Sequence, residues 1–254
     1  MLINIFILCY NERILLPLTV GYYKRIFPNS EIIITIYDNE SSDDSVEIAK
    51  SLGCNVISWS SNNENNILMK ADVSNNCWKN VKDGWVIVID MDEWLCISEE
   101  LLMKEQENGT TILSTQGLQM IGCSYSPTLD DINLNKINRV LFYDLESKCV
   151  CFFKPKIKEM NYDLGCHYCN PIGYIKFSSD VYIIKHFSFL GLPFFINKNA
   201  HRFKRSKRIM DKFKYSTHYK EDVDKIENEY LSQLRDSFSI ENLKNYYYFP
   251  DDSL

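Results

Sequence analysis

The stretch from Trp85 to Leu95 reads WVIVIDMDEWL, and it decides the fold. Its opening run, WVIVI, is apolar and rich in β-branched side chains, which predicts a strand buried on both faces. The strand runs into the acidic sequence DMDE, and burying these carboxylates is costly unless a cation meets them. Because residues two apart in an extended segment share a side, Asp90 and Asp92 project together as hard oxygen ligands for Mg²⁺ or Mn²⁺. The alternative is a solvated acidic loop that caps a helix near Ser98.

An alternation of strands and helices precedes this stretch. Strands are predicted over residues 2–8, 31–37 and 54–59, with the intervening helices ending near Phe27, Leu52 and Val81. This order calls for a parallel sheet with right-handed crossovers, in which ligands bind beyond the carboxyl ends of the strands. Three polar clusters fall at those ends: Tyr10-Asn11-Glu12, Asp38-Asn39 and Asp90-Met91-Asp92. The sequence therefore predicts one site at this edge, although Asp38-Asn39 is also a good helix-capping turn, with Ser42 or Asp43 as the cap.

The pattern changes after Leu95. A short helix is predicted over 98–107, strands are predicted at 111–115, 139–143, 150–153 and 181–186, and the chain from about Leu190 is predicted to be helical. No Gly/Ser-rich linker or repeat separates these parts. We therefore expect a single domain over 1–254, made of the segments 1–95, 96–190 and 191–254.

Composition narrows the class of protein. The chain has 254 residues, 45% hydrophobic content and a formal net charge of −6, which suits one α/β domain and disfavours nucleic-acid binding. Nine cysteines, an N-terminus without a basic n-region and no apolar run long enough to span a bilayer predict reduced thiols and a cytoplasmic location.

One stretch is basic against this acidic background. Arg202 to Lys214 includes Lys204, Arg205, Lys207 and Arg208. The stretch is either a solvated helix face, a clamp for a diphosphate, or a peripheral contact with an acidic membrane surface.

Several motifs, in order, resemble the GT-A fold of nucleotide-sugar glycosyltransferases, most closely family 2 and its relatives in family 92. They are FILCYNE (6–12), IYDNESSDDS (36–45) and DGWVIVIDMDEWL (83–95), with looser matches at KPKI (154–157), GCH (165–167) and KHF (185–187). The resemblance implies an α/β, Rossmann-like fold with a mostly parallel central sheet flanked by helices and a mixed second half.

The resemblance also implies roles for the polar strand ends. Asp38 and Asn39 would contact the nucleobase or ribose, and Tyr10, Asn11 and Glu12 would line the same pocket. Asp90 and Met91 would also meet the nucleotide sugar. Lys70, on the helix before the metal strand, would approach the pyrophosphate, although a surface lysine is the plainer reading.

The resemblance also implies a metal site and a catalytic base. A Mn²⁺ or Mg²⁺ ion would be held by Asp90, Asp92 and His186, with a structural histidine as the alternative for His186. The Glu-Asp pair that family 2 places beyond the metal motif is missing between 150 and 190. The candidates for the catalytic base are therefore Asp163, the first choice, and Glu93.

The implied activity is a metal-dependent glycosyltransferase, a hexosyltransferase or related enzyme that is inverting in outcome. Its donor would be a UDP-, GDP- or dTDP-linked sugar and its acceptor a glycan or another hydroxyl, with His167 on the acceptor side. A non-catalytic GT-A-like domain that binds a sugar or nucleotide is the alternative, because the Glu-Asp pair is missing. Oligomeric state is left open.

Two further readings compete. Cys166 and Cys169, with Cys149 and Cys151 upstream, have one C-x-x-C spacing of a zinc module but lack the second pair, which favours ordinary thiols. Nucleotidyltransferases normally carry a Gly-rich phosphate loop after the first strand, and here that position is Cys9-Tyr10-Asn11-Glu12 without glycine.

Overall fold

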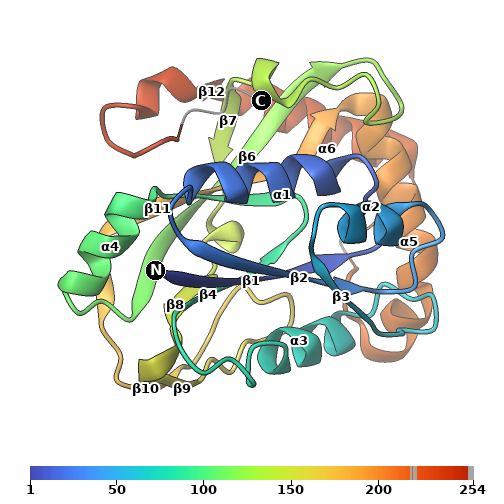
Figure 1. Ribbon diagram of the computed structural model, residues 1–254. Coiled ribbons are helices and arrows are strands. Elements are labelled where there is room, and N and C mark those ends of the chain that lie inside the picture. Colours follow the sequence, from blue (N-terminus) through green and yellow to red (C-terminus); the bar gives the residue numbers. More distant parts are fainter. Residues whose placement is uncertain (218, 220–221, 251–254) are drawn as a thin grey trace.

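The computed structural model describes residues 1–217, 219 and 222–250. Its centre is a ten-stranded sheet with the order β12-β7-β6-β8-β4-β1-β2-β3, in which β11 also pairs with β6 and β5 (Figure 1). Positions 218, 220, 221 and 251–254 of the expected C-terminal helical region lie outside the described residues.

The first half of the chain builds the parallel part of this sheet. Its strands are β1 (Leu2–Cys9), β2 (Glu31–Asp38), β3 (Asn55–Ser58) and β4 (Trp85–Asp90). β1 lies between β2 and β4, and β3 pairs with β2, all in parallel register. The predicted strands and their parallel arrangement are confirmed.

The central strands are buried on both faces, as their apolar runs predict. Ile3, Ile5 and Ile7 of β1 pack into the core that contains helix α1 (Leu15–Ile26). The alternating residues Phe6 and Val88 face a second core, formed with Trp78. Helices therefore cover both faces of the sheet, with α1 on one side and α3 (Ile67–Asn76) on the other (Figure 1).

Two helix boundaries differ from the prediction. Helix α2 (Ser45–Ser51) has Asp44, not Ser42 or Asp43, at its N-cap position, although Asp43 Oδ1 accepts from the N–H of the first helical residue, Ser45. Helix α3 stops at Asn76 rather than near Val81, since Trp78 turns inward and its indole Nε1 donates to Ser74 O.

The second half adds strands of mixed direction. They are β5 (Glu93–Cys96), β6 (Ile112–Ser124), β7 (Arg139–Phe142), β8 (Cys151–Phe153), β11 (Phe177–Gly191) and β12 (Phe238–Ser239), with β9 (Ile157–Glu159) and β10 (Ile172–Gly173) forming a separate pair. β8 is antiparallel to both β4 and β6, whereas β11 is parallel to β6. The expected mostly parallel sheet with a mixed extension, the architecture that the GT-A resemblance implies, is confirmed.

The sequence did not predict strands β9, β10 and β12, the last of which lies in the stretch expected to be helical, nor did it predict strand β5. Strand β5 follows the DMD turn directly and pairs antiparallel with β11, so that Glu93 lies opposite His186. Its four residues are all buried, with the Trp94 ring stacked on Tyr22 of α1. The chain therefore forms a buried strand here and not the solvated acidic loop that was the alternative.

A glycine lets a loop approach strand β6. A Cβ on Gly117 would lie 2.6 Å from the carbonyl oxygen of Tyr143, so a side chain has no room there. The 3₁₀ turn η2 (Asp144–Glu146) packs against the strand at this point and carries Glu146 to the edge of the sheet. The other 3₁₀ turns are η1 (Leu134–Lys136), η3 (Lys154–Lys156) and η4 (Ile240–Leu243).

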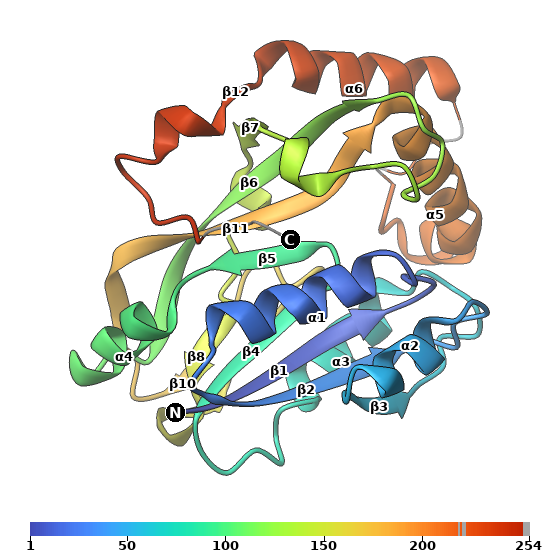
Figure 2. The same cartoon turned by 45° about the horizontal axis from the view of Figure 1, so that its top comes forward.

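Helices α4 (Glu99–Glu107), α5 (Leu192–Phe213) and α6 (Val223–Asp236) complete the described chain. Ser98 caps α4 through its side chain, as predicted. Helices α5 and α6 lie beside the carboxyl ends of the parallel strands, at the end of the sheet opposite α4 (Figure 2). No helix among the described residues is long and apolar enough to cross a membrane.

Candidate active site

Two adjoining cavities lie beyond the carboxyl ends of β1 and β4. The first, of about 240 Å³, extends toward β6, β11 and α6, and the second, of about 250 Å³, extends toward the β1–α1 turn. Their common wall consists of Leu8, Asn65, Lys70, Asp90, Asp92, Lys198 and Arg202. Both aspartates of the DMD turn therefore face the junction of the two cavities.

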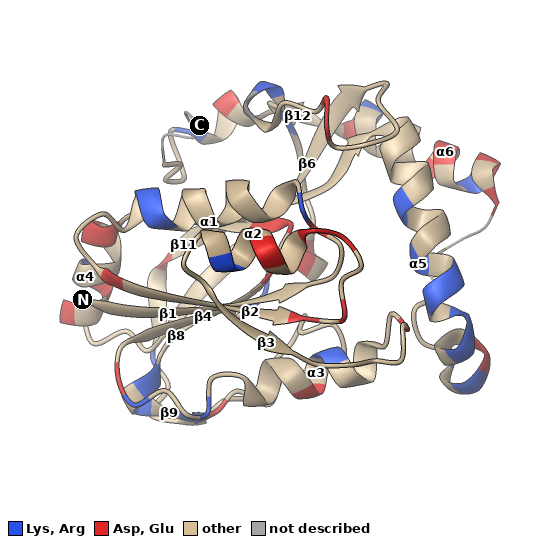
Figure 3. Ribbon diagram, turned by 45° about the vertical axis from the view of Figure 1, so that its right-hand side comes forward, with Lys and Arg blue, Asp and Glu red and all other residues tan. Residues whose placement is uncertain are grey.

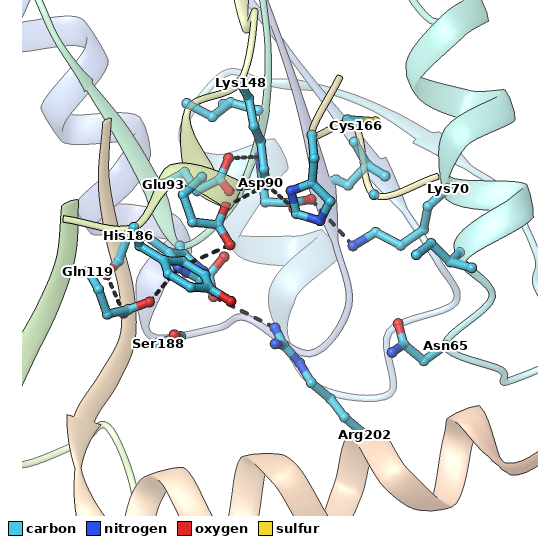
Figure 4. Close-up of a pocket in the computed structure, with 18 of the residues that line it drawn as sticks. Asn65, Lys70, Asp90, Glu93, Gln119, Lys148, Cys166, His186, Ser188 and Arg202 are labelled. Atoms are coloured by element: carbon cyan, nitrogen blue, oxygen red, sulfur yellow. Dashed lines mark hydrogen bonds and ion pairs between the residues drawn. The ribbon is translucent and has the colours of Figure 1, made fainter. Parts of the chain in front are cut away.

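Asp90 is held between two lysines. Its Oδ1 lies 3.5 Å from Lys70 Nζ on α3, and its Oδ2 lies 3.7 Å from Lys148 Nζ (Figure 4). Burial alone would favour the neutral acid, but Lys70 and Lys148 keep the pKa of Asp90 below its ordinary value. Lys70 lines both cavities, and Asp90 raises the pKa of its ammonium against the effect of burial.

Asp92 is almost fully buried and meets three cationic or ionisable groups through one oxygen. Its Oδ2 lies 2.6 Å from Lys198 Nζ, 3.6 Å from His186 Nε2 and 3.7 Å from Arg202 Nη2. Lys198 and Arg202 are four residues apart on α5, so they share one face of that helix. Although burial opposes ionisation, these partners hold the pKa of Asp92 well below its usual range.

A second cluster of acidic side chains, Glu93 and Glu146, surrounds Lys148 next to Asp90 and Asp92. The ammonium of Lys148, itself buried, forms an ion pair with Glu93 and lies 2.9 Å from Glu146 Oε2. Burial raises the pKa of Glu93 to about 7, whereas the pKa of Glu146 falls below its ordinary value because His186 and Lys148 outweigh its burial. Figure 4 shows Asp90, Glu93, Lys148 and His186 converging on one point.

His186 links the two groups. Its Nδ1 lies 3.0 Å from Gln119 Oε1 and 3.6 Å from Glu146 Oε1, on the opposite side of the ring from Asp92. Gln119 Nε2 in turn donates to the backbone oxygen of His186 at 2.9 Å, which fixes the pair across β6 and β11. The neighbouring carboxylates raise the pKa of His186, against the effect of its burial.

The ligand atoms at this junction suit a divalent cation. Asp92 Oδ2 and His186 Nε2 are close enough to share one ion, and a carboxylate with an imidazole fits Mn²⁺. Within the described residues, the set of three side chains with ligand atoms inside 4.8 Å is Glu93, Glu146 and His186. The expected trio of Asp90, Asp92 and His186 lines the first cavity, but only His186 of the three belongs to that tighter set.

Tyr10, Asn11 and Glu12 line the second cavity, as expected. The guanidinium of Arg205 lies 3.3 Å from the centre of the Tyr10 ring. Asn11, with a positive φ of 54°, is bonded to Ser41 and Ser42 and so fixes the turn between strand and helix. Burial, with Asp92 contributing, raises the pKa of Glu12 to about 7 despite the opposing charge of Lys198.

Asp38 and Asn39 differ in their exposure to this cavity. Asn39 lines it, but its amide is bonded to Ser61 through both its oxygen and its nitrogen. Asp38 is buried behind the wall, where Oδ2 accepts from the Ser41 N–H and Oδ1 has no hydrogen-bond partner among the described residues. Met91 also lines the second cavity, although the residue is buried in the core.

The remaining predicted residues lie on the loop after β9. His167 lines the first cavity, and its Nδ1 contacts Leu145 O. Asp163 lies outside both cavities, because its exposed carboxylate accepts from the Tyr168 N–H at 2.9 Å and closes its own turn. The structure therefore does not bring Asp163 to the other candidates, whereas Glu93 is among them.

The cysteines give no support to a zinc module. All nine are free thiols, as expected, and the ligand cluster around His186 contains none of them. Cys166 lines the first cavity, and Cys149 and Cys169 pack with it around Tyr162.

Several residues of the junction were missed by the sequence reading. Glu146 ends η2 and Lys148 follows two residues later, in a segment without a periodic pattern, while Gln119 lies inside a strand. Lys198 could have been found, since Lys198, Arg202 and Arg205 follow the 4-and-3 spacing of one helix face. Figure 3 shows this repeated positive charge along α5.

Comparisons with known proteins concern the fold. No family model matches the chain, and no curated protein matches it. Among solved structures, TarS from S. aureus matches 95% of this chain at 14% identity and a TM-score of 0.47. This chain spans 45% of that TarS chain.

Two other solved structures match part of the chain. Glucosyl-3-phosphoglycerate synthase from Mycobacterium tuberculosis, with Mn²⁺ and UDP, matches 45% of this chain and 43% of its own at 16% identity and a TM-score of 0.32. The mannosyltransferase PcManGT from Pyrobaculum calidifontis, with GDP-Man and Mn²⁺, matches 49% and 36% at 12% identity and a TM-score of 0.34. At these identities the likeness is one of chain fold and carries no substrate assignment.

Proposed function

We propose that this chain is a metal-dependent glycosyltransferase that moves a hexosyl group from a nucleoside-diphosphate sugar to a hydroxyl acceptor, with inversion. The observation that carries the proposal is the wall shared by two cavities, where Asp90 and Asp92 meet Lys70, Lys198 and Arg202. A cavity for the donor and a cavity for the acceptor must meet where the sugar is transferred.

The second cavity is assigned to the nucleotide. Tyr10 offers an aromatic face there, and Arg205 and His201 lie next to its ring. Lys70, Lys198 and Arg202 approach the junction from α3 and α5, so their charges can balance the diphosphate as it leaves. The free oxygen of Asp38 suits an N–H of the base once the wall opens to it.

Asp92 and His186, with Asp90 beside them, would hold the metal, and UDP-, GDP- and dTDP-sugars remain the candidate donors. When bound, a divalent cation supplies Lewis-acid stabilisation of charge on the leaving diphosphate. Lys198 occupies Asp92 Oδ2 at 2.6 Å, so the lysine must shift toward the diphosphate when an ion takes that oxygen.

Glu93 is our choice for the base that takes the acceptor proton. It lines the first cavity next to both aspartates, whereas Asp163 lies in neither cavity. Lys148 and the Asp90 N–H hold the Glu93 carboxylate in place. His167, on the same cavity, would contact the acceptor.

The test is a thermal-shift screen of nucleotide sugars with and without Mn²⁺, followed by assays of nucleoside-diphosphate release. We expect Mn²⁺ and one donor together to raise the melting temperature more than either alone. Asp92→Asn should lower turnover at least about a hundredfold, the scale of losing one electrostatic stabiliser. Near-normal release by this variant would refute the proposal.

Glu93→Gln and Asp163→Asn separate the two candidate bases. The first should abolish transfer and leave donor binding intact, and the second should behave as wild type. If donor binds but no acceptor ever stimulates release, the chain is the non-catalytic binding domain instead.

A further inference from the structure

The two nitrogens of the His186 ring face different carboxylates. Nε2 lies 3.6 Å from Asp92 Oδ2, and Nδ1 lies 3.6 Å from Glu146 Oε1. A neutral imidazole offers a metal ion only the nitrogen that lacks a hydrogen, so the position of that hydrogen decides which carboxylate can share an ion with the ring. Two positions for a cation therefore compete, one on each side of His186.

The side chain of Gln119 places this hydrogen. Its Nε2 lies 2.9 Å from the backbone oxygen of His186, and its Oε1 lies 3.0 Å from His186 Nδ1 (Figure 4). A carbonyl oxygen only accepts, so the first contact requires the amide NH₂ on that side and turns the amide oxygen toward the ring. Because the amide oxygen also only accepts, Nδ1 must carry the hydrogen, and Nε2 is left as the nitrogen that can bind a metal ion.

The sheet fixes the position of Gln119. The residue is 2% exposed, and its backbone lies opposite Leu141 of β7 on one side and opposite His186 of β11 on the other. Turning the amide over would set its oxygen against the His186 carbonyl oxygen and leave two buried acceptors facing each other, which is costly. The orientation that puts the hydrogen on Nδ1 is therefore built into the pairing of β6 with β11.

The carboxylate on the Nδ1 side of the ring already has a cation. The buried ammonium of Lys148 lies within 4 Å of three carboxylates, those of Asp90, Glu93 and Glu146. A divalent cation on that side would have to displace Lys148 from all three. On the Nε2 side, Lys198 pairs with one carboxylate among the described residues, that of Asp92, so it is the easier of the two lysines to displace.

We propose that Gln119 is a positioning residue that holds His186 with its hydrogen on Nδ1 and so presents Nε2, beside Asp92, to the divalent cation. This inference rests on the proposed function for the metal and adds the residue that selects the coordinating nitrogen. Gln119 acts through His186 and not on the ion, because a hydrogen-bond acceptor behind a metal-binding histidine fixes the tautomer and the direction of the ring.

The first measurement is the tautomer of His186 in the metal-free protein, by ¹⁵N NMR of the imidazole groups at a pH where the ring is neutral. The chain has four histidines, and a His186→Gln variant identifies the signals of this one. We expect the hydrogen on Nδ1 in the wild type. Gln119→Met removes the acceptor, so the ratio of the Nδ1–H to the Nε2–H tautomer should fall at least about tenfold, because Asp92 can then accept from Nε2.

The second measurement is the affinity for Mn²⁺ without nucleotide, by calorimetric titration. Gln119→Met should weaken binding about tenfold, the lower end of the losses seen when a group behind a metal ligand is removed. Gln119→Glu keeps an acceptor at Nδ1, so it should restore the Nδ1–H tautomer and most of the affinity. Gln116→Met makes the same change on the same strand, at a position that lines neither cavity, and should alter neither measurement.

The outcomes separate the inference from the proposed function. A hydrogen on Nε2 in the wild type, or a Gln119→Met variant that keeps the Nδ1–H tautomer or the wild-type Mn²⁺ affinity, overturns the inference and leaves the glycosyltransferase standing. No release of nucleoside diphosphate from any donor refutes the proposed function, while the two measurements above, which use no donor, still decide the role of Gln119. A wild type that binds no Mn²⁺, with or without nucleotide, overturns both.

Discussion

Lys198 on α5 donates a 2.6 Å hydrogen bond to Asp92, 106 positions earlier in the chain. The bond joins α5 to the acidic turn after β4, and it places an ammonium on the oxygen that the proposed metal needs. The lysine and the ion thus compete for one carboxylate until a diphosphate offers the lysine another anion.

Lys198→Met should consequently have two effects of opposite sign. Without nucleotide, Mn²⁺ should bind about tenfold more tightly, a change of about 1.4 kcal/mol, because Asp92 is no longer occupied. Turnover should fall, because the leaving diphosphate loses a positive charge. Calorimetric titration with Mn²⁺ and an assay of donor turnover measure the two, and weaker Mn²⁺ binding by the variant would contradict the competition.

Lys148 should contribute strongly to stability. It is 5% exposed and pairs with Glu93 and Glu146, so Lys148→Met leaves buried carboxylates uncompensated. Breaking a buried pair in this way costs about 3–5 kcal/mol. Urea unfolding gives the value, with the exposed Lys82→Met as the control variant.

A double variant makes that prediction sharper. Adding Glu146→Gln to Lys148→Met removes one of the stranded charges, so the pair should be less destabilised than the sum of the two single changes. Strict additivity would mean that Lys148 and Glu146 do not interact.

The extent to which the sequence predicted this fold depends on the part of the chain. β1 and β4 are buried on both faces, so their apolar runs are continuous and easy to locate. The polar residues that end such strands must gather at one edge, and Tyr10, Asn39 and Asp90 do so. This part of the site follows from topology alone.

The side of the first cavity that β6 and β11 form had no comparable pattern in the sequence. Strand β6 extends to Ser124 through Gln116, Gly117 and Gln119, polar or small residues that break the pattern of a buried strand. Gly117 and Gln119 are nevertheless buried, because β6 pairs with β11, a contact between segments about 65 residues apart. The sequence also gives no sign that the Asp163 carboxylate accepts from the Tyr168 N–H within its own turn.

Glu99 should make stability depend on pH. Its buried carboxylate accepts from the Asn29 N–H at 3.0 Å and from Ser30 Oγ, which ties α4 to the turn before β2. Although burial opposes ionisation, these bonds lower the pKa of Glu99 below 4.5. A lowered folded-state pKa means that the unfolded chain takes up the proton first, so the stabilisation exists above pH 4.5 and is lost as pH falls through the folded value.

Glu99→Gln should therefore destabilise the protein by about 1.5–3 kcal/mol at pH 7, the range for hydrogen bonds to a charged group. The difference from wild type should shrink as pH falls below 4.5. Unfolding by urea at a series of pH values tests this, and Glu100→Gln on the exposed side of the same helix is the matched control. A difference that grows on acidification would contradict the assignment.

Arg205 holds the loop that borders the proposed nucleotide cavity. Its guanidinium covers the Tyr10 ring and donates to the carbonyl oxygens of Asn63 and Glu64, both at 3.2 Å. Lysine keeps the charge but lacks the planar fork that stacks and bonds at once. Arg205→Lys should raise the KM for the donor about tenfold, or about 1.4 kcal/mol, and change kcat less than twofold, because the contact orders the binding wall and not the reacting atoms.

Arg208→Lys provides the comparison one turn along α5. Arg208 pairs with Glu64 on the exposed side of the same loop, and lysine can keep that pair, so its donor KM should stay within about twofold of wild type. Initial rates against donor concentration, at saturating Mn²⁺, measure both variants. A fall in kcat without a change in KM for Arg205→Lys would mean that Arg205 acts on the reacting atoms and not on nucleotide binding. Equal effects of the two variants would mean that Arg205 only supports the loop.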